Sequence, residues 1–213
     1  MIPNQNGNTE TICRGCCSAI NKIESRQNDT VAYLRKIGVG KRYYDCSFDN
    51  FHGGDKYIEF CWDWYIKREE SIFFTGSFGC GKTHLAVALC RELIKCSELY
   101  SVRFEFSIDL LYQIRKTFSS SEDTDSLINQ LANVDYLVID DLGAEKTTEW
   151  SIETMSLIID RRDREMRPTI ITSNLSLGEV AEKISGRIAS RMANGKIVKI
   201  DMPDYRKKRN NRG

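Results

Sequence analysis

The sequence lacks an apolar run long enough to cross a bilayer, which takes roughly 20 residues. Residues 1–11 are polar and lack the apolar stretch of a secretory signal peptide. These two absences argue against export and against a membrane partner. We therefore expect a cytoplasmic protein.

The chain also lacks a net charge of either sign. Lysine and arginine total 31 against 30 aspartate and glutamate residues, for a formal net charge of +1. Contact with nucleic acid would need a local basic patch, because the surface as a whole does not attract polyanions. One basic run begins at Arg206 and continues through a tail at residues 207–213. A solvated chain end is the simpler explanation of this tail, and nucleic-acid contact is the alternative.

Regularly paired cysteines are missing, although the chain has 8 cysteines. Cys13, Cys16 and Cys17 are too close together for simple disulfide pairing. With no export signal, reduced thiols are expected. Tetrahedral zinc takes four ligands, usually from two Cys-x-x-Cys pairs, and only one such pair is present. The pattern favours free or intermolecularly used thiols, with zinc held by these three cysteines as the alternative.

Short apolar runs alternate with amphipathic stretches over most of the chain. The 213 residues, 41% of them hydrophobic and 29% charged, suit one globular domain. Strands are expected at residues 71–75, 101–106, 136–139, 168–172 and 196–200, and helices at residues 56–70, 83–95, 108–118, 126–132, 149–164, 177–184 and 186–193. This alternation predicts an α/β fold, a parallel sheet with helices on both faces. Residues 1–55 are more polar and are expected to form a small, partly ordered region.

The strongest motif is the phosphate loop at residues 76–83, which fits G-x-x-x-x-G-K-[ST] in full between a predicted strand and a predicted helix. Its glycines allow the backbone to wrap closely around phosphates, and the helix N-terminus offers N–H donors to an anion. Lys82 would reach the β- and γ-phosphates, and the Thr83 hydroxyl would coordinate Mg²⁺. The expected nucleotide-binding residues are Gly76, Ser77, Phe78, Gly79, Cys80, Gly81, Lys82 and Thr83.

A second motif is the acid pair Asp140-Asp141, which ends a predicted strand. The strand would place these carboxylates beside the phosphate loop. We expect Asp140 to bind Mg²⁺ and Asp141 to polarise an attacking water as a general base. A pair of acids that merely ends a strand is the alternative.

Two weaker signals follow along the chain. Asn174 comes just after the next predicted strand and could orient the water near the γ-phosphate, or it could simply form a turn. Arg187 and Arg191 are four residues apart and therefore share one helix face. Taken alone, that face is more simply explained as solvated. In the functional interpretation, an arginine reaches the nucleotide of a neighbouring subunit.

Together the motifs resemble the DnaC/IstB branch of the AAA+ ATPases, a group of helicase loaders and transposase helpers built on the P-loop NTPase fold. The resemblance covers residues 38–206. It implies a five-stranded core whose acidic strand lies two places from the phosphate-loop strand, with no separate C-terminal helical lid. The segments that carry it are residues 48–51, 79–85, 138–143, 170–174, 187–192 and 204–206.

The resemblance also implies roles for individual residues. Asn174 corresponds to the first sensor, Arg191 to the arginine finger and Arg187 to an accessory. Arg206 corresponds to a late basic residue that senses the γ-phosphate. The residues expected beside the nucleotide are Phe48 and Phe51, which border the adenine, and His84, a family marker that follows the phosphate loop.

The implied function is an ATP- and Mg²⁺-dependent helicase loader with slow, switch-like hydrolysis, to which the short second acid Asp141 is suited. Residues 1–55 would dock the replicative helicase, and residues 56–206 would form the ATPase core and assemble into a homo-oligomer through the ATP interface. Single-stranded DNA would contact the helix at residues 108–118, with Arg115 and Lys116. The alternatives are an IstB-like transposition helper and a nucleotide-binding adaptor that does not hydrolyse ATP.

Overall fold

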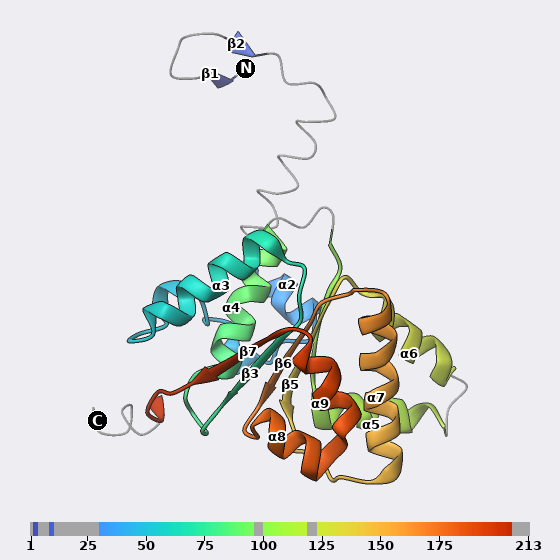
Figure 1. Cartoon of the computed structure of the whole chain (residues 1–213). Coiled ribbons are helices and arrows are strands. Elements are labelled where there is room, and N and C mark those ends of the chain that lie inside the picture. Colours follow the sequence, from blue (N-terminus) through green and yellow to red (C-terminus); the bar gives the residue numbers. More distant parts are fainter. Residues whose placement is uncertain (1, 4–8, 11–29, 96–99, 119–122, 206–213) are drawn as a thin grey trace.

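The computed structural model describes residues 2–3, 9–10, 30–95, 100–118 and 123–205 (Figure 1). The predictions that concern Cys13, Cys16, Cys17 and Arg206, and the basic tail at residues 207–213, lie outside the described residues.

The core is a five-stranded parallel sheet with the strand order β4-β5-β6-β3-β7. The strands are β3 (Ile72–Gly76), β4 (Val102–Phe106), β5 (Tyr136–Leu142), β6 (Thr169–Ser173) and β7 (Lys196–Ile200). The acidic strand β5 lies two places from the phosphate-loop strand β3, with β6 between them. This arrangement confirms the predicted α/β fold class.

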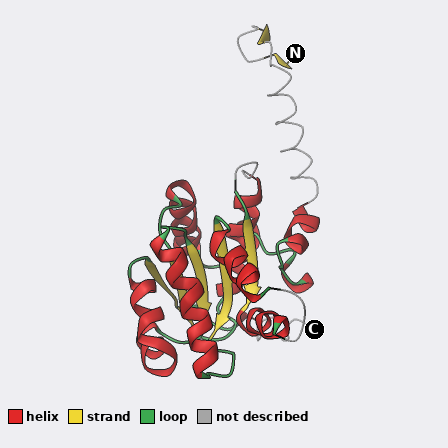
Figure 2. Cartoon of the chain, turned by 90° about the vertical axis from the view of Figure 1, so that its right-hand side faces the viewer, coloured by secondary structure: helices red, strands yellow, loops and turns green. Residues whose placement is uncertain are grey.

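Helices cover both faces of the sheet, as Figure 2 shows. They are α2 (Thr30–Lys36), α3 (Asp55–Lys67), α4 (Lys82–Lys95), α5 (Ser107–Thr117), α6 (Thr124–Asn133), α7 (Glu149–Arg164), α8 (Leu177–Val180) and α9 (Gly186–Ala193). Two 3₁₀ turns, η1 (Lys41–Tyr43) and η2 (Phe48–Asn50), precede α3, and a π-helical turn, η3 (Ala181–Ser185), joins α8 to α9. Among the described helices, none has the length and apolarity that a membrane span requires.

Two hydrophobic cores lie on opposite faces of the sheet because successive strand residues point to opposite sides. In β3, Ile72 and Phe74 pack with α2, α3 and α4, whereas Phe73 packs with α5, α6, α7 and α9. Every residue of β6 is buried, as expected for a central parallel strand covered on both faces.

The described part of the N-terminal region contributes to the first of these cores. Leu34, Ile37, Val39, Phe48 and Phe51 are buried in the same cluster as the apolar side of α4. The backbone N–H of Phe104 in the edge strand β4 donates to the carbonyl of Ile37, which ties this segment to the sheet. The domain boundary at residue 55 stays a prediction, since packing alone does not define where a partner-binding region ends. The pair β1 (Ile2–Pro3) and β2 (Thr9–Glu10) is antiparallel.

Candidate functional site

The candidate site lies where β3, β5 and β6 end side by side, since carboxyl ends of parallel strands meet at one edge of the sheet. The phosphate loop follows β3, and α4 begins at Lys82. The N-terminus of α4 therefore presents its N–H groups and its positive dipole end to the loop. Ligands in open α/β sheets bind at this edge.

Glycine is required at two loop positions. Gly79 and Gly81 have φ angles of +72° and +102°, a region that other residues rarely adopt. A Cβ atom at Gly79 would lie 1.8 Å from a carboxylate oxygen of Asp204, and one at Gly81 would lie 2.5 Å from the ring of Phe51. Segments before α3 and after β7 thus pack directly on the loop backbone, which fits a cradle for phosphate.

The ammonium group of Lys82 is held within the loop. Its side chain donates to the carbonyls of Gly76 and Ser77 and to Oδ1 of Asn174, each at 2.8 Å. Cys80 Sγ lies 3.8 Å from the same nitrogen. Lys82 is only 7% exposed, and this burial lowers its pKa. The surrounding oxygen acceptors keep the ammonium hydrogen-bonded despite this burial.

Asp140 is a buried carboxylate between two hydroxyl groups. Thr83 Oγ1 donates to one of its oxygens at 3.1 Å, and Thr172 Oγ1 donates to the other at 2.7 Å. Asp140 is 1% exposed, and burial raises its pKa to about 6. A neighbouring cation would favour the ionised form.

The oxygen donors at this position suit Mg²⁺. The described residues contain no cluster of three or more His, Cys, Asp or Glu side chains arranged for a metal. Mg²⁺ bound with a nucleotide needs no such cluster, since it takes one or two protein oxygens and completes its octahedron with phosphate and water. Thr83 and Asp140 would supply these two oxygens.

Asp141 has a left-handed backbone, with a φ angle of +60°. Three hydrogen bonds with neighbouring side chains help to hold this unusual conformation. Its N–H donates to Thr172 Oγ1 at 2.9 Å, its carbonyl accepts from Ser107 Oγ at 2.9 Å, and its carboxylate accepts from Asn174 Nδ2 at 2.6 Å. Such strain persists where the surroundings over-determine the geometry, often at functional sites. Because Asn174 also accepts from Lys82, the amide bridges the loop lysine and the acid.

Strand β5 extends further than the sequence predicts. The predicted strand ends at residue 139, whereas β5 continues through both acids to Leu142, with a register irregularity between Ile139 and Leu142. Side-chain hydroxyls satisfy part of the interrupted ladder, as Ser173 Oγ donates to the carbonyl of Leu142. Thr172 and Ser107 are site residues that sequence reasoning missed, because a buried hydroxyl carries no pattern of its own.

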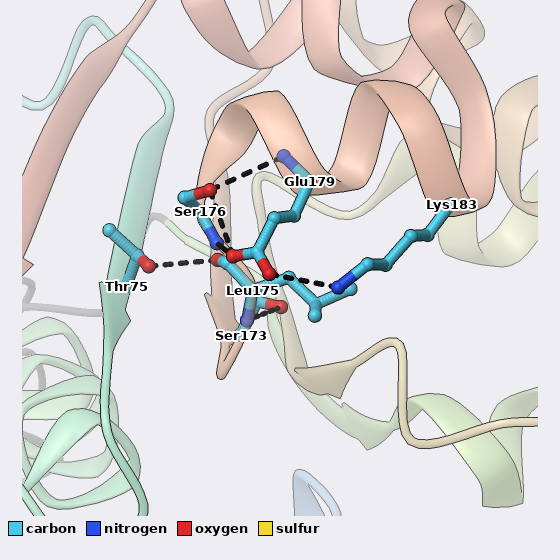
Figure 3. A network of polar contacts seen from close by, with 6 residues as sticks. All are labelled: Thr75, Ser173, Leu175, Ser176, Glu179 and Lys183. Atoms are coloured by element: carbon cyan, nitrogen blue, oxygen red, sulfur yellow. Dashed lines mark hydrogen bonds and ion pairs between the residues drawn. The ribbon is translucent and has the colours of Figure 1, made fainter.

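The turn that carries Asn174 is fixed on both sides (Figure 3). Before it, Ser173 Oγ accepts the N–H of Leu175, whose carbonyl in turn accepts from Thr75 Oγ1 of β3 at 2.8 Å. After it, Ser176 and Glu179 form a capping box at the start of α8, and Lys183 pairs with Glu179 at 2.8 Å. Asn174 therefore lies between residues that are themselves held by hydrogen bonds.

Arg187 and Arg191 lie in a separate ionic cluster against α7. Both contact the carboxylate of Asp160, which confirms that they share a helix face. Arg191 Nε donates to Asp160 Oδ1 at 2.9 Å, and its Nη1 lies 3.4 Å from Asp163 Oδ2. The structure thus joins the phosphate loop, both acids and Asn174, and it places the two arginines on α9 with α7 carboxylates as their partners.

His84 links the phosphate-loop helix to the N-terminal segment. Its Nε2 lies 2.8 Å from the carbonyl oxygen of Ser47, which can only accept, so Nε2 carries the proton. Burial lowers the pKa of His84, which favours the neutral ring. The His84 ring meets the Phe51 ring edge to face, with 5.2 Å between the ring centroids. The Phe48 ring packs on the Trp62 ring, with 5.1 Å between their centroids. Phe51 is therefore next to the phosphate loop, whereas Phe48, in η2, packs on Trp62 of α3.

The chain returns to the loop after β7. The N–H of Tyr205 donates to the carbonyl of Gly79 at 3.1 Å. Tyr205 is the last described residue, so the prediction for Arg206 stays untested.

The outer face of α5 carries exposed apolar and basic side chains. Ile108, Tyr112 and Phe118 are exposed, with Tyr112 at 68%. The guanidinium of Arg115 lies over the ring of Trp150 at 4.6 Å from its centroid. The start of this helix reaches the acidic strand through the Ser107 hydrogen bond described above.

Known proteins share both the sequence and the fold. Residues 55–212 match the family described as "IstB-like ATP binding protein". The replicative helicase loader DnaC of Escherichia coli (strain K12) is 30% identical over 190 residues, which cover 84% of this chain and 75% of the relative. A crystal structure of the DnaC helicase loader aligns with a TM-score of 0.68 at 26% identity, covering 76% of this chain and 100% of that one.

A more distant structure shows the fold alone. The replication initiator DnaA bound to AMPPCP and single-stranded DNA aligns with a TM-score of 0.66 at 22% identity, over 77% of this chain and 51% of that one. The family match covers most of the chain and includes the phosphate loop, the acidic strand and the Asn174 turn. The chain therefore belongs to the IstB-like ATP-binding proteins, in the DnaC-like branch of the P-loop AAA+ ATPases.

Proposed function

We propose that this protein is a slow ATPase that binds ATP with Mg²⁺ and delivers or remodels a replicative DNA helicase in the cytoplasm. The observation that carries the proposal is the bridge from Lys82 through Asn174 to Asp141, beside the Thr83–Asp140 pair. These contacts bring the side chains of Lys82, Asp140 and Asp141 together at one edge of the sheet, which supports the proposed phosphate, metal and water roles.

Each side chain has a defined task in this proposal. Lys82 would leave its loop carbonyls for the β- and γ-phosphates, and Thr83 and Asp140 would hold Mg²⁺. The bound Mg²⁺ would neutralise charge on the phosphates. Asp141 would accept a proton from the attacking water, and Asn174 would orient that water while it keeps Asp141 in place. The shorter aspartate, compared with glutamate, suits slow hydrolysis that acts as a switch.

The loading role rests on the relatives. A 30% identical relative that covers 84% of this chain is named a replicative helicase loader. In the proposed assembly, copies of this chain form a homo-oligomer, and Arg191 of one copy faces the nucleotide bound to the next. Phe48 and Phe51 would border the adenine, and Arg187 and Arg206 would assist at the phosphates. Residues 1–55 would dock the helicase.

Single-stranded DNA is the proposed nucleic-acid ligand, at the outer face of α5. Tyr112 and Phe118 offer aromatic surfaces on which bases stack, and Arg115 and Lys116 offer charge to the backbone. Such binding is tolerant of sequence and weakens as salt increases.

Steady-state ATP hydrolysis tests the proposal. We expect a low basal rate that rises with single-stranded DNA or with the helicase, and a loss of hydrolysis in Lys82→Ala and Asp141→Asn. Hydrolysis no faster than in Lys82→Ala would contradict the ATPase. Equal ADP release from wild type and Asp141→Asn would indicate an adaptor. A preference for double-stranded DNA with stimulation of strand transfer would indicate a transposition helper.

A further inference from the structure

One nearly buried carboxylate on α7 holds both arginines of α9. The side chain of Asp160 is 5% exposed. Its Oδ1 accepts from Arg191 Nε at 2.9 Å, and its Oδ2 contacts Arg187 Nη2. Because a different guanidinium pairs with each oxygen, the two ion pairs restrict rotation of the carboxylate group.

The contacts leave one edge of Arg191 available. Asp160 takes Nε and Asp163 approaches Nη1, so within the described residues these ion pairs do not use Nη2. The side chain of Arg191 remains 38% exposed. A guanidinium held by its inner edge can still present a terminal N–H₂ to an oxygen outside its own chain.

The ion pairs of Asp160 order the arginine side chains more than they stabilise the fold. Both guanidinium groups reach water, and exposed ion pairs contribute little to folding. A free arginine side chain, however, samples many rotamers and must be ordered when it binds a partner. Asp160 removes much of that freedom before any partner arrives.

We propose that Asp160 is a positioning residue for Arg191, which it holds in the conformation that reaches the nucleotide of the adjacent subunit. The inference rests on the proposed ATPase, in which Arg191 acts across the subunit interface. It adds a residue on α7 that never contacts nucleotide and yet controls hydrolysis. In the unassembled chain, Arg187 contacts the second oxygen of Asp160 and helps to hold the carboxylate.

The test is a double-mutant cycle on ATP hydrolysis with the full-length chain at a concentration where it assembles. We expect Asp160→Asn to lower kcat about tenfold with an unchanged KM for ATP. The variant disorders the Arg191 side chain, which acts on the nucleotide of the adjacent subunit, and leaves the chain's own ATP site intact. Asp160→Asn in an Arg191→Ala background should have no further effect. Asp163→Asn, which removes only the 3.4 Å contact, is the matched control and should change kcat less than twofold. Asp160→Glu should recover part of the lost kcat.

The outcomes separate the two levels of the proposal. Wild-type hydrolysis in Arg191→Ala would contradict the proposed function itself. A strong loss in Arg191→Ala with a wild-type kcat in Asp160→Asn would overturn only the positioning role, as would an additive loss in the double variant. If Asp160→Asn does not fold, NMR of the Nε–H group of Arg191 in the wild type decides. The Nε–H group of Arg191 should be more ordered than that of Arg161, and equal disorder of the two groups would overturn the inference.

Discussion

The hydroxyl of Ser107 donates to the backbone carbonyl of Asp141 at 2.9 Å. Ser107 is the first residue of α5, whose outer face is the proposed site for single-stranded DNA. Asp141 is the proposed general base and has a left-handed backbone. A hydrogen bond therefore connects the helix that would sense DNA to the acid that would act on water.

Ser107→Ala should weaken the response of hydrolysis to DNA. We expect the DNA-stimulated kcat to fall roughly threefold to tenfold, because a small misplacement of a catalytic group is costly. Loss of this buried hydrogen bond should also lower the free energy of unfolding by about 1 kcal/mol. Ser156→Ala, at a buried serine on α7, controls for the general effect of removing a hydroxyl. Equal stimulation by DNA in both variants would refute the connection.

Asn174→Ala should separate nucleotide binding from hydrolysis. The variant loses the bridge between Lys82 and Asp141, so we expect kcat to fall about 100-fold, as for a lost oxyanion-type donor. Affinity for ATP, measured with a fluorescent analogue, should change far less because the loop backbone is intact. The exposed Asn129→Ala on α6 is the control. Hydrolysis at the wild-type rate would exclude Asn174 from the reaction.

Asp140→Asn should stabilise the metal-free protein at neutral pH. Burial raises the pKa of Asp140 to about 6, above its unfolded value of roughly 3.9. The native state thus binds the proton more tightly, and the free energy of unfolding of the wild type decreases as the pH rises from about 4 to about 6. In EDTA, we expect the advantage of Asp140→Asn to be about 3 kcal/mol larger above pH 7 than near pH 4.

Urea unfolding at several pH values measures this difference. Mg²⁺ with ATP should stabilise the wild type more than Asp140→Asn, because only the wild type has the carboxylate. A stability difference that is independent of pH would show that Asp140 titrates normally.

Arg162 should be among the most sensitive positions for stability. Its side chain is fully buried and donates six hydrogen bonds to the end of α6, the turn before β5, and the residues at and just before the start of β6. Burial lowers its pKa to about 9. Arg162→Ala leaves these acceptors without a donor, so we expect a loss of roughly 3–5 kcal/mol in urea unfolding. Its half-buried neighbour Arg161 is the control, and Arg161→Ala should change stability by about 0.5 kcal/mol or less.

His84→Ala should loosen the segment that precedes α3. His84 and Arg91 are two turns apart on α4, and they bond the carbonyls of Ser47 and Tyr44. We expect faster amide hydrogen exchange at residues 44–51 and weaker ATP binding, with kcat at saturating ATP little changed. Lys95→Ala, later on the same helix, should have neither effect. Unaltered exchange would show that Phe51 is held by packing alone.

The order of strands and helices could be predicted because buried parallel strands are short apolar runs. The helix expected at residues 149–164 has these bounds. As the resemblance implied, the acidic strand lies two places from β3, with β6, which ends at Ser173, between them. The phosphate loop could also be predicted from the sequence, because the spacing of its glycines reflects what the backbone needs to wrap around phosphate. The grouping of Lys82, Asp140, Asp141 and Asn174 followed from that topology.

The remaining features depend on contacts that a single sequence does not display. Asp160 and Arg162 lie in a run of charged residues, which is indistinguishable in sequence from a solvated helix face. Arg162 is buried only because carbonyls from two separate loops converge on it. The packing of residues 30–51 on α4 was also missed, since its polar composition hides the few apolar side chains that enter the core.

The phosphate loop is enclosed by segments from both sides of the core sequence. Phe51 covers Gly81, and Asp204 and Tyr205 cover Gly79. A fragment that runs only from β3 to β7 would keep every residue of the phosphate loop. It would lose Phe51 on one side of the loop and Asp204 and Tyr205 on the other. A minimal fragment that still recognises nucleotide must therefore begin before Phe51 and extend through Tyr205.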